Sequence, residues 1–321
     1  MNVVFYKIKI SQGTGAVLGL NRVKNLVDPT TAYLMFGDKC NNNCEFCSQS
    51  EGETRLSRVM WPEFDIYTFV QAFNKKGYKF KNICIQVTKS EKTSIMTLNI
   101  IKYLRDNIKF NININVSIDL MNYPELMYKF IECGVNRIGI AIDVASEKEF
   151  FFIKHKNFKK NIEFLYESVE KFPDRISAHL IIGLGETSYE LFSLINSFLL
   201  KQINVSLFAY TPIKKKGYLE EKKSPDIKYY RLCQAIFYLL KKKEIEFNDI
   251  VFDENNFVKK VNYKKIPGIL GDGEFFRTSG CEGCNRPFYN EKVTGDWYNF
   301  PRKPKDNEIH EEIKRINEFF I

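Results

Sequence analysis

The stretch Cys40-Asn41-Asn42-Asn43-Cys44-Glu45-Phe46-Cys47 decides how the rest of this sequence is interpreted. Its three cysteines have the spacing C-x3-C-x2-C and follow the apolar run Ala32–Phe36, which predicts a strand. The run ends in Gly37-Asp38-Lys39, so we expect the thiols on a loop. A loop can direct three sulfurs toward one face of a cubic iron–sulfur cluster. Three thiolates leave the fourth iron of such a cluster open for chemistry.

Two other interpretations of these thiols remain open. The pairs Cys44-x2-Cys47 and Cys281-x2-Cys284 could form a four-thiolate zinc site, but they lie about 237 residues apart and would leave Cys40 unused. Structural zinc pairs usually lie only tens of residues apart. The thiols could instead be small hydrophobes packed in a core, although their Asn- and Glu-rich surroundings argue for a polar loop. The spacing therefore favours an iron–sulfur cluster.

The composition predicts one large domain, or one domain with an appendage. The chain has 321 residues, 44% of them hydrophobic, which is enough for a sizeable core. No apolar run approaches the length of a membrane span, and the N-terminus lacks the core of a signal peptide. We therefore expect a cytoplasmic protein without a membrane partner. In that reducing compartment, the eight cysteines are expected as metal ligands or free thiols rather than disulfides.

The net charge of +9 is carried by short basic clusters such as Lys241–Lys243 and Lys264–Lys265. Most such clusters are solvated faces, yet together they suit an acidic partner, either nucleic acid or an acidic carrier protein. No zinc-finger, helix-turn-helix or RNA-binding signature accompanies the lysines, so nucleic acid is the weaker option.

From about residue 31, short β-branched runs alternate with amphipathic segments. Strands are predicted at Ala32–Phe36, Asn82–Val87, Ile112–Ile118, Ile138–Ile142, Ile176–Ile182 and Val205–Tyr210. Helices are predicted at Trp61–Gly77, Ser94–Asp106, Asn122–Cys133, Leu191–Lys201 and Pro225–Lys243, and in a long region after Ser146 that breaks near Lys156. Capping boxes at Ser146-x-x-Glu149 and Thr187-x-x-Glu190 mark two helix starts. Six strand–helix units in strict alternation indicate an α/β fold with a parallel sheet.

Both a doubly wound sheet and a barrel fit six such units. Because no GxGxxG follows the first strand, we favour a full or partial parallel (β/α) barrel over residues 31–245. Residues 1–30 are then an N-terminal extension. Residues 246–321 are richer in Gly, Pro, Asp and Asn, end in a helix predicted at Glu308–Phe320, and form an appendage. In barrels the loops after the strands build the active site, and the cysteine loop is the first of them.

The motif Cys40-x3-Cys44-x-Phe46-Cys47 after a first barrel strand resembles the signature of the radical S-adenosylmethionine enzymes, including the aromatic residue before the last cysteine. The resemblance covers roughly residues 30–245. It implies a 4Fe–4S cluster on Cys40, Cys44 and Cys47, with Phe46 beside the cofactor and S-adenosylmethionine completing the open iron. An electron from the cluster, which an external electron donor supplies, then cleaves the sulfonium, and the 5′-deoxyadenosyl radical that is released takes hydrogen from an unactivated carbon.

Other positions resemble S-adenosylmethionine contacts of the same family. Gly183 and Gly185 are similar to the stretch that biotin synthase and its relatives place beside the adenosyl group, although they could equally be turn residues. Asp143 resembles the acid that binds the ribose hydroxyls, with an ordinary loop acid as the alternative. The Gly-Gly-Glu that the family often has at the end of strand two is missing here, and Gln86 is the expected substitute.

Cys84 resembles, in position, a strand-two cysteine that biotin synthase uses on its second, sacrificial cluster. Biotin synthase also has cysteines on strands three and five, where this sequence has Ser117 and Ser177, so that cluster cannot be built in the same way.

Cys281-x2-Cys284 is the expected replacement, because Gly280 and Gly283 free the backbone to aim both sulfurs one way. A surface turn with two free thiols is the alternative. The preceding Arg277-Thr278-Ser279 resembles an Arg-Ser-Ser of bacterial lipoyl synthase, whose serine caps an auxiliary cluster, which would make Ser279 a catalytic residue.

Together with Gly13–Leu20, Pro29–Leu34 and Leu56–Val59, these motifs make the whole chain similar to one component of the two-protein lipoyl synthase of archaea. The resemblance implies sulfur insertion into an octanoyl chain on a carrier protein or lipoyl-domain peptide, with a second radical S-adenosylmethionine component as a further partner. An acidic carrier would match the positive charge. The alternatives are a biotin-synthase-like methylase, cyclase or mutase with a structural CxxC site, or a zinc-stabilised nucleic-acid-binding protein.

Overall fold

A computed structural model describes residues 6–213, 217–265, 268 and 270–321, which fold around one eight-stranded sheet. Six strands are parallel and adjacent in chain order: β2 (Thr31–Phe36), β6 (Asn82–Val87), β7 (Asn113–Ser117), β8 (Arg137–Asp143), β9 (Ile176–Ile182) and β10 (Asn204–Ala209). The antiparallel strands β1 (Lys7–Ile10) and β5 (Glu63–Asp65) extend the sheet beyond β2. Among the described residues, the sheet ends at β10 on one side and at β5 on the other. The predicted α/β fold with six parallel strand–helix units is therefore confirmed, as a partial barrel.

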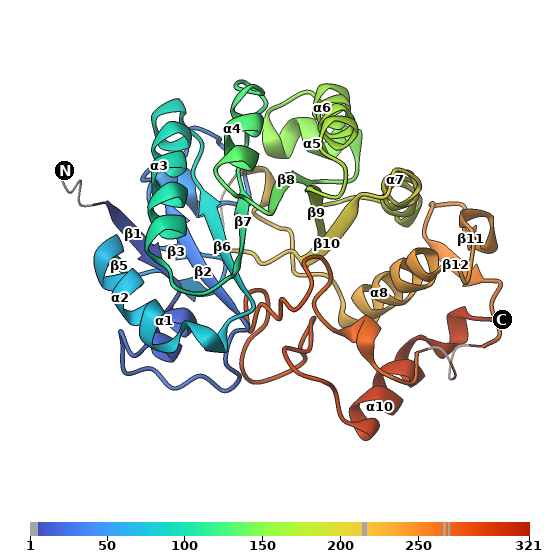
Figure 1. Ribbon diagram of the computed structural model, residues 1–321. Helices are drawn as coiled ribbons and strands as arrows, with labels where there is room; N and C mark the ends of the chain where they lie inside the picture. The colour runs from blue at the N-terminus through green and yellow to red at the C-terminus, as the bar shows by residue number, and fades with distance from the viewer. Residues whose placement is uncertain (1–5, 214–216, 266–267, 269) are drawn as a thin grey trace.

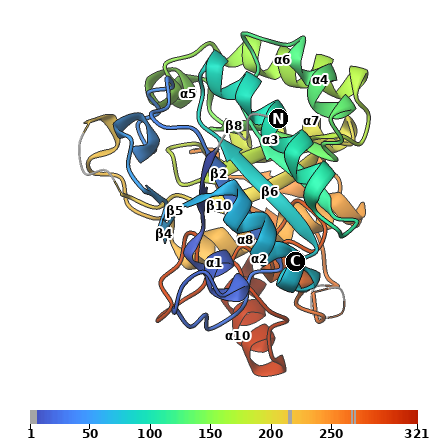
Figure 2. The same cartoon turned by 60° about the vertical axis from the view of Figure 1, so that its left-hand side comes forward.

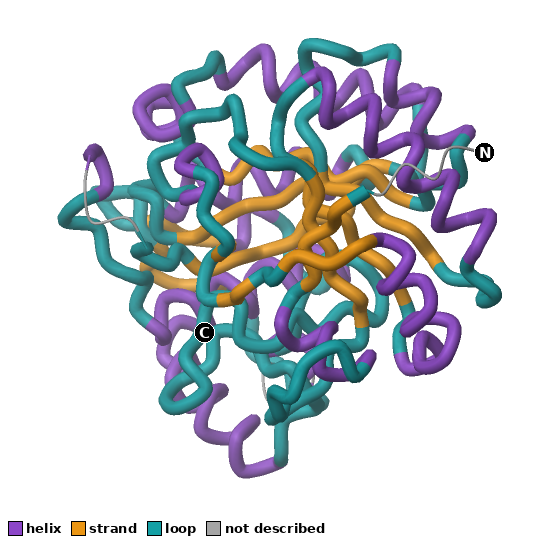
Figure 3. Tube along the Cα trace, turned by 90° about the vertical axis from the view of Figure 1, so that its left-hand side faces the viewer, coloured by secondary structure: helices purple, strands orange, loops and turns teal. Residues whose placement is uncertain are grey.

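Helices surround the strands on the outside (Figure 3). They are α2 (Ile66–Lys76), α3 (Glu91–Asn107), α4 (Leu126–Glu132), α5 (Glu147–Lys154), α6 (Phe158–Lys171), α7 (Ser188–Leu200) and α8 (Ile227–Lys242). The gap between α5 and α6 is the predicted break near Lys156. Ser146 and Thr187 cap α5 and α7, because each side chain accepts a hydrogen bond from a backbone N–H three residues later.

The prediction of a helix over Trp61–Gly77 is wrong at its start. Residues Glu63–Asp65 form β5, which pairs with β1, and the helix begins only at Ile66. Phe64 and the later apolar residues have helical spacing, but the free edge of β1 offers backbone hydrogen bonds that the spacing does not reveal. The helix expected from Asn122 likewise begins later, at Leu126.

The two ends of the chain contribute further elements. Residues 1–30, expected as an extension, supply β1 and the short helix α1 (Gln12–Leu18), while residues 1–5 lie outside the described part. The remaining elements are the two-stranded pairs β3 (Arg55–Leu56) with β4 (Val59–Met60) and β11 (Ile250–Phe252) with β12 (Val258–Val261), and the helix α10 (Asp306–Ile316). The predicted helix Glu308–Phe320 is thus shorter and continues as a 3-10 turn over Asn317–Phe319. Figure 2 shows α10 at the opposite end of the molecule from α4 and α6.

Alternation along the strands separates the helix-facing core from the interior of the barrel. Ala32 and Leu34 on β2 are fully buried in the main hydrophobic core. The intervening Tyr33 points to the other face, where its register partner on β6 is Cys84. Small residues such as Ser117 and Ala141 occupy this inner face of the neighbouring strands. Since small side chains cannot fill a barrel interior, a cavity is left there.

The C-terminal part of the chain covers the open side of the partial barrel. We call residues 277–291 the closing segment; Figure 1 shows this orange-to-red part of the chain between the β2 side and the β10 side of the sheet. On the β2 side, Thr30 Oγ1 donates a hydrogen bond of 2.6 Å to the carbonyl oxygen of Gly283. On the β10 side, the backbone N–H of Leu207 donates to Ser279 Oγ at 2.8 Å. The closing segment therefore links the two sides.

In the described part of the chain, no helix combines the length and the apolarity needed to cross a membrane. All eight cysteines lie in described residues, and each carries a free thiol.

Candidate active site

One cavity of about 300 Å³ lies inside the partial barrel and contains thiols from distant parts of the chain. The loop after β2 contributes the thiols of Cys40, Cys44 and Cys47, which we call the first thiol group. Cys84 on β6 and Cys281 and Cys284 on the closing segment contribute the other three, which we call the second thiol group. The volume is at the lower end of the range for small-molecule sites. Six of the eight cysteines therefore face one space.

The first thiol group lies at the C-terminal ends of the parallel strands. Burial raises the pKa of the Cys44 thiol, and it raises the pKa of Cys47 to about 12, with further increases from the neighbouring thiols of Cys44 and Cys40. Cys40 Sγ accepts a hydrogen bond of 3.2 Å from the backbone N–H of Lys89. Thiolates this close together and this buried need compensating positive charge, which a metal cluster supplies. The three residues therefore fit an iron–sulfur cluster.

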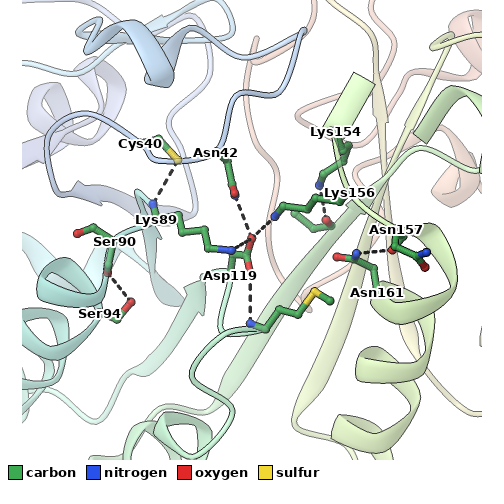
Figure 4. A network of polar contacts seen from close by, with 12 residues as sticks. Cys40, Asn42, Lys89, Ser90, Ser94, Asp119, Lys154, Lys156, Asn157 and Asn161 are labelled. Atoms are coloured by element: carbon green, nitrogen blue, oxygen red, sulfur yellow. Dashed lines mark hydrogen bonds and ion pairs between the residues drawn. The ribbon is translucent and has the colours of Figure 1, made fainter. Parts of the chain in front are cut away.

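A network around Asp119 holds the first thiol group's loop against its neighbours (Figure 4). Asp119 follows β7, and its Oδ2 accepts hydrogen bonds from Lys89 Nζ at 3.1 Å, from Asn42 Nδ2 at 2.9 Å and from Lys156 Nζ. Burial alone would raise the pKa of this carboxyl, but the two lysines and Asn42 lower it further than burial raises it, and the pKa lies well below its usual range. One carboxylate thus joins the loops after β2, β6 and β7 to the end of α5.

A buried ion pair lies beside this network. Asp143 ends β8 with a positive φ of 66°, where the register between β8 and β9 shifts. Such a bulge redirects the side chain, and Asp143 lines the cavity. Its Oδ2 accepts a hydrogen bond of 2.5 Å from Lys154 Nζ, which also donates to the carbonyl of Ala141 at 2.6 Å. Burial disfavours the Lys154 cation, but Asp143 and the nearby Cys44 raise its pKa overall.

The second thiol group lies toward the N-terminal ends of the strands, among aromatic side chains. Cys84, Cys281 and Cys284 line the same part of the cavity, and Cys84 and Cys284 pack against one hydrophobic cluster. Burial raises the pKa of Cys84, and the thiols of Cys281 and Cys284 raise it further. Gln86 Nε2 donates a hydrogen bond to Cys84 Sγ at 3.3 Å. The hydroxyl of Tyr33 lies 3.1 Å from Cys284 Sγ. Residues almost 200 positions apart thus form one sulfur-rich corner of the cavity.

Both CxxC pairs adopt the same local turn. The backbone N–H of Cys47 donates to the carbonyl of Cys44 at 3.1 Å, and that of Cys284 donates to the carbonyl of Cys281 at 3.2 Å. Gly280, just before the second pair, has a φ of 104°, and a Cβ there would lie only 1.9 Å from Ser206 Oγ on β10. Only glycine fits this close approach, which brings the second pair against the sheet.

The radical SAM superfamily model matches residues 34–197, just over half of the 321 residues. This chain belongs to the radical SAM superfamily. The superfamily implies a 4Fe–4S cluster and S-adenosylmethionine, and the first thiol group is the part of this chain that fits that cluster. No curated protein matches the chain.

Solved structures of radical SAM proteins have the same fold. The structure of HydG, a maturase of the FeFe-hydrogenase, is 14% identical with a TM-score of 0.54, covering 66% of this chain and 49% of HydG. Methylornithine synthase (PylB) is 12% identical with a TM-score of 0.50, covering 66% of this chain and 62% of PylB. This radical SAM chain therefore spans about half the length of HydG and under two thirds of PylB. At these identities the likeness concerns the fold alone.

Most of the predicted cofactor residues of this radical SAM protein line the cavity, and two do not. Phe46, Gln86 and Asp143 line it, although Gln86 donates its hydrogen bond to Cys84. Gly183 and Gly185 follow β9 with φ values of 100° and 112°, and their nearest side-chain neighbours are Pro225 for Gly183 and Lys222 and Glu149 for Gly185. Ser279 lines the cavity, and its hydroxyl oxygen accepts the hydrogen bond from Leu207 that anchors the closing segment.

The donor geometry bears on the zinc interpretation of the sequence. Among the described residues, no three His, Cys, Asp or Glu side chains converge closely enough to hold a single metal ion. A four-thiolate zinc site of Cys44, Cys47, Cys281 and Cys284 is accordingly not formed there. A cluster of several irons spreads its ligands farther apart than one ion does, so the spacing of the first thiol group remains compatible with the 4Fe–4S cluster that the superfamily implies.

Sequence reasoning missed several residues of this radical SAM site. Among them, Tyr33 was the easiest to predict from the sequence, since it alternates with Ala32 and Leu34 and pairs in register with Cys84. Asp119 and Lys154 carry no local motif, because their partners lie on other strands and loops. Arg286 on the closing segment stacks over Phe208, with its guanidinium carbon 3.7 Å from the ring centre, and no sequence pattern indicates this contact.

Proposed function

We propose that this radical SAM protein is a sulfurtransferase that inserts sulfur into an unactivated carbon of a protein-bound octanoyl chain, as one component of a lipoyl synthase. The observation that carries the proposal is the presence of two separate groups of three thiols in one cavity. One group accounts for radical generation. The second would be superfluous for that step alone and suits a source of sulfur.

The first thiol group and its neighbours would bind the superfamily cofactors. When bound, the 4Fe–4S cluster and S-adenosylmethionine together supply a radical that removes hydrogen from carbon. Lys154 holds Asp143 Oδ2 and thereby orients the carboxylate, whose Oδ1 can accept hydrogen bonds from ribose hydroxyls. Lys89 and Lys156, held by Asp119, place two positive charges beside the thiolates. These charges favour an anionic cluster and the carboxylate of the cofactor.

The second thiol group would hold the auxiliary iron–sulfur cluster that is consumed as the sulfur source. Cys84, Cys281 and Cys284 are its ligands in this proposal, and Ser279 anchors the segment that carries two of them. Burial of these thiols keeps water away from the sulfides. An external electron donor and a second radical SAM component complete the proposed system.

The walls of the cavity suit an acyl substrate. Apolar side chains contribute to its lining, namely Met35, Val87, Ile118, Ile181, Phe208 and Ile213. Such a lining can accept an octanoyl chain by apolar burial. The net charge of +9 suits the acidic surface of a carrier protein or lipoyl domain.

The test is metal analysis followed by product mass. After anaerobic reconstitution, we expect about eight irons per chain, corresponding to two cubic clusters. The reconstituted protein, given S-adenosylmethionine, a reductant and an octanoylated carrier peptide, should add sulfur to the peptide, as detected by mass spectrometry. About four irons per chain would contradict the presence of an auxiliary cluster. Turnover of S-adenosylmethionine without any gain of sulfur would favour a methylase, cyclase or mutase instead.

A further inference from the structure

Two tyrosines, Tyr33 and Tyr289, belong to a small hydrophobic cluster beside the second thiol group. Tyr33 and Tyr289 pack with Met35 and Trp61 in a hydrophobic cluster separate from the main core, and Cys84 and Cys284 pack against it. The rings of Tyr33 and Tyr289 are 5.3 Å apart, and Trp61 meets Tyr289 edge-on at 6.2 Å. Aromatic side chains with hydroxyl groups thus form one wall around the second thiol group.

The hydrogen bonds of Tyr33 determine where its proton points. Its hydroxyl oxygen accepts a hydrogen bond of 2.9 Å from the backbone N–H of Arg286, because a peptide N–H can only donate. The hydroxyl proton is then left for the other close neighbour, Cys284 Sγ at 3.1 Å. Tyr33 therefore donates to this sulfur, which favours a thiolate or a cluster-bound sulfur over a neutral thiol.

Tyr289 presents a hydroxyl with a different status. Its side chain is only 9% exposed, and its Oη has no hydrogen-bond partner among the described residues. A buried hydroxyl without a partner is destabilising, and in native proteins it calls for a ligand or another role. Cys84 and Cys284 pack against the hydrophobic cluster that contains Tyr289, so these sulfurs lie beside it. The hydroxyl is consequently a free donor beside the second thiol group.

Arg286 adds positive charge at the same place. Its Nη2 donates to the carbonyl oxygens of Leu207 and Ser279 at 3.1 and 3.2 Å, which fixes the guanidinium. Its Nη1 is buried and has no hydrogen-bond partner among the described residues. The two residues that carry these unpartnered donors, one of them cationic, both line the cavity that the second thiol group shares. Such a pair is suited to an anion.

We propose that the second thiol group includes a binding site for inorganic sulfide, in which the Tyr289 hydroxyl donates a hydrogen bond to the sulfide and Tyr33 donates to Cys284. Arg286 Nη1 supplies the charge that balances the sulfide and the thiolates. The inference rests on the proposed auxiliary cluster, and it names the residues that retain the transferable sulfur. Tyr289 is thereby a ligand-binding residue rather than a packing residue.

The experiment uses the full chain with Cys40, Cys44 and Cys47 all replaced by Ala, so that only the second thiol group is measured. This background and its Tyr289→Phe, Tyr33→Phe and Tyr230→Phe derivatives are reconstituted anaerobically with ferrous iron and sulfide. Tyr230 is the matched control, since its buried hydroxyl bonds to Asn299 Oδ1 at 3.4 Å and does not line the cavity. We then measure iron and sulfide per chain and the melting temperature of the unloaded protein. We also measure the rate at which sulfide is released after an iron chelator is added.

Tyr289→Phe should leave the melting temperature of the unloaded protein unchanged or raised, because the hydroxyl loses no protein partner. Once loaded, this variant should release sulfide about tenfold faster, as expected for loss of one hydrogen bond to a charged group. Tyr33→Phe should also accelerate release. Tyr230→Phe should lower the melting temperature and leave the release rate unchanged.

Two results overturn the inference in distinguishable ways. If the background variant takes up no iron and no sulfide, the auxiliary cluster fails and the sulfide site fails with it. If the background loads normally and Tyr289→Phe releases sulfide at the background rate, the auxiliary cluster stands and only the role of Tyr289 is refuted. In that second case, a lower melting temperature of unloaded Tyr289→Phe would identify its hydroxyl as structural.

Discussion

The two thiol groups each contain a CxxC turn of the same kind, but the residues that surround the two turns differ. In each, a CxxC pair closes with a hydrogen bond from the second cysteine to the first. The first group is surrounded by charges, with Lys89, Lys156 and Asp119 in one network and the Asp143–Lys154 pair beside it. The second is surrounded by rings and hydroxyls, chiefly Tyr33, Trp61 and Tyr289.

The difference in surroundings matches the two tasks that we propose for the thiol groups. Fixed charges bind a charged, exchangeable cofactor, since they can replace the water that it loses on binding. Aromatic walls exclude water and leave a few hydroxyl groups to hold sulfur, which suits storage of a group that water would otherwise release. The comparison implies that changes at one group should leave the function of the other intact.

The largest effect is expected from removing thiols. Cys44→Ala should lower the cleavage of S-adenosylmethionine at least about a thousandfold, because the cluster loses one of its three ligands. The double variant Cys281→Ala, Cys284→Ala should retain cleavage within about twofold and lose sulfur insertion. Release of 5′-deoxyadenosine and the mass of the carrier peptide measure the two activities.

Cys133→Ala is the control for these thiol variants, since Cys133 does not line the cavity. It should change neither activity. If the Cys281, Cys284 double variant lost cleavage as well, the two thiol groups would have to be regarded as one functional unit.

A smaller effect is expected from Asp119→Asn, which removes the counter-ion of Lys89 and Lys156. These side chains are less than a quarter exposed, so the variant should lose about 3 kcal/mol of unfolding free energy at pH 7. The pKa of Asp119 is lowered in the folded protein, so its contribution is present above the unfolded pKa and is lost as the pH falls through and below about 4. Urea unfolding across this range should show wild type and variant converging in acid.

Asp106→Asn, in the exposed last turn of α3, is the matched control and should be neutral. Iron should also leave the first thiol group faster in Asp119→Asn, while the second group is unaffected. Equal loss of iron from both groups would contradict the functional independence of the two thiol groups.

The smallest effect concerns Glu186, which accepts hydrogen bonds from the backbone N–H groups of Gly183 and Leu184 at the same end of the sheet as the first thiol group. Burial raises its pKa to about 7, although these N–H groups oppose the shift. A raised pKa in the folded state means that its stabilising contribution is present at low pH and is lost as the pH rises through 7. Between pH 5 and 8 the unfolding free energy of the wild type should fall by about 2 kcal/mol.

Glu186→Gln should remove most of this pH dependence, as measured by urea unfolding at pH 5, 6.5 and 8. If the variant kept the full pH dependence of the unfolding free energy, that dependence would have to come from another titrating side chain.

Local patterns predicted much of the fold. The strands Asn82–Val87 and Ile176–Ile182 match the structure residue for residue, because each is a β-branched run bounded by polar or turn residues. The capping box of Thr187 and Glu190 marked the start of α7 for the same reason, since cap and partner are three residues apart. In contrast, β5 was predicted as helix, because its pairing with β1 joins residues more than 50 positions apart.

The amino-acid sequence by itself determined the first thiol group, because all three cysteines lie within eight residues and one loop can present them together. Only the tertiary structure decided that Cys84 lines the same cavity as Cys281 and Cys284. This placement depends on the closing segment lying against both β2 and β10, through contacts such as Thr30 with Gly283. It also decided the surroundings of each group, since the charges of one and the hydroxyls of the other come from separate strands and loops. Side chains that act together without being close in sequence leave no local pattern, and only folding brings them into contact.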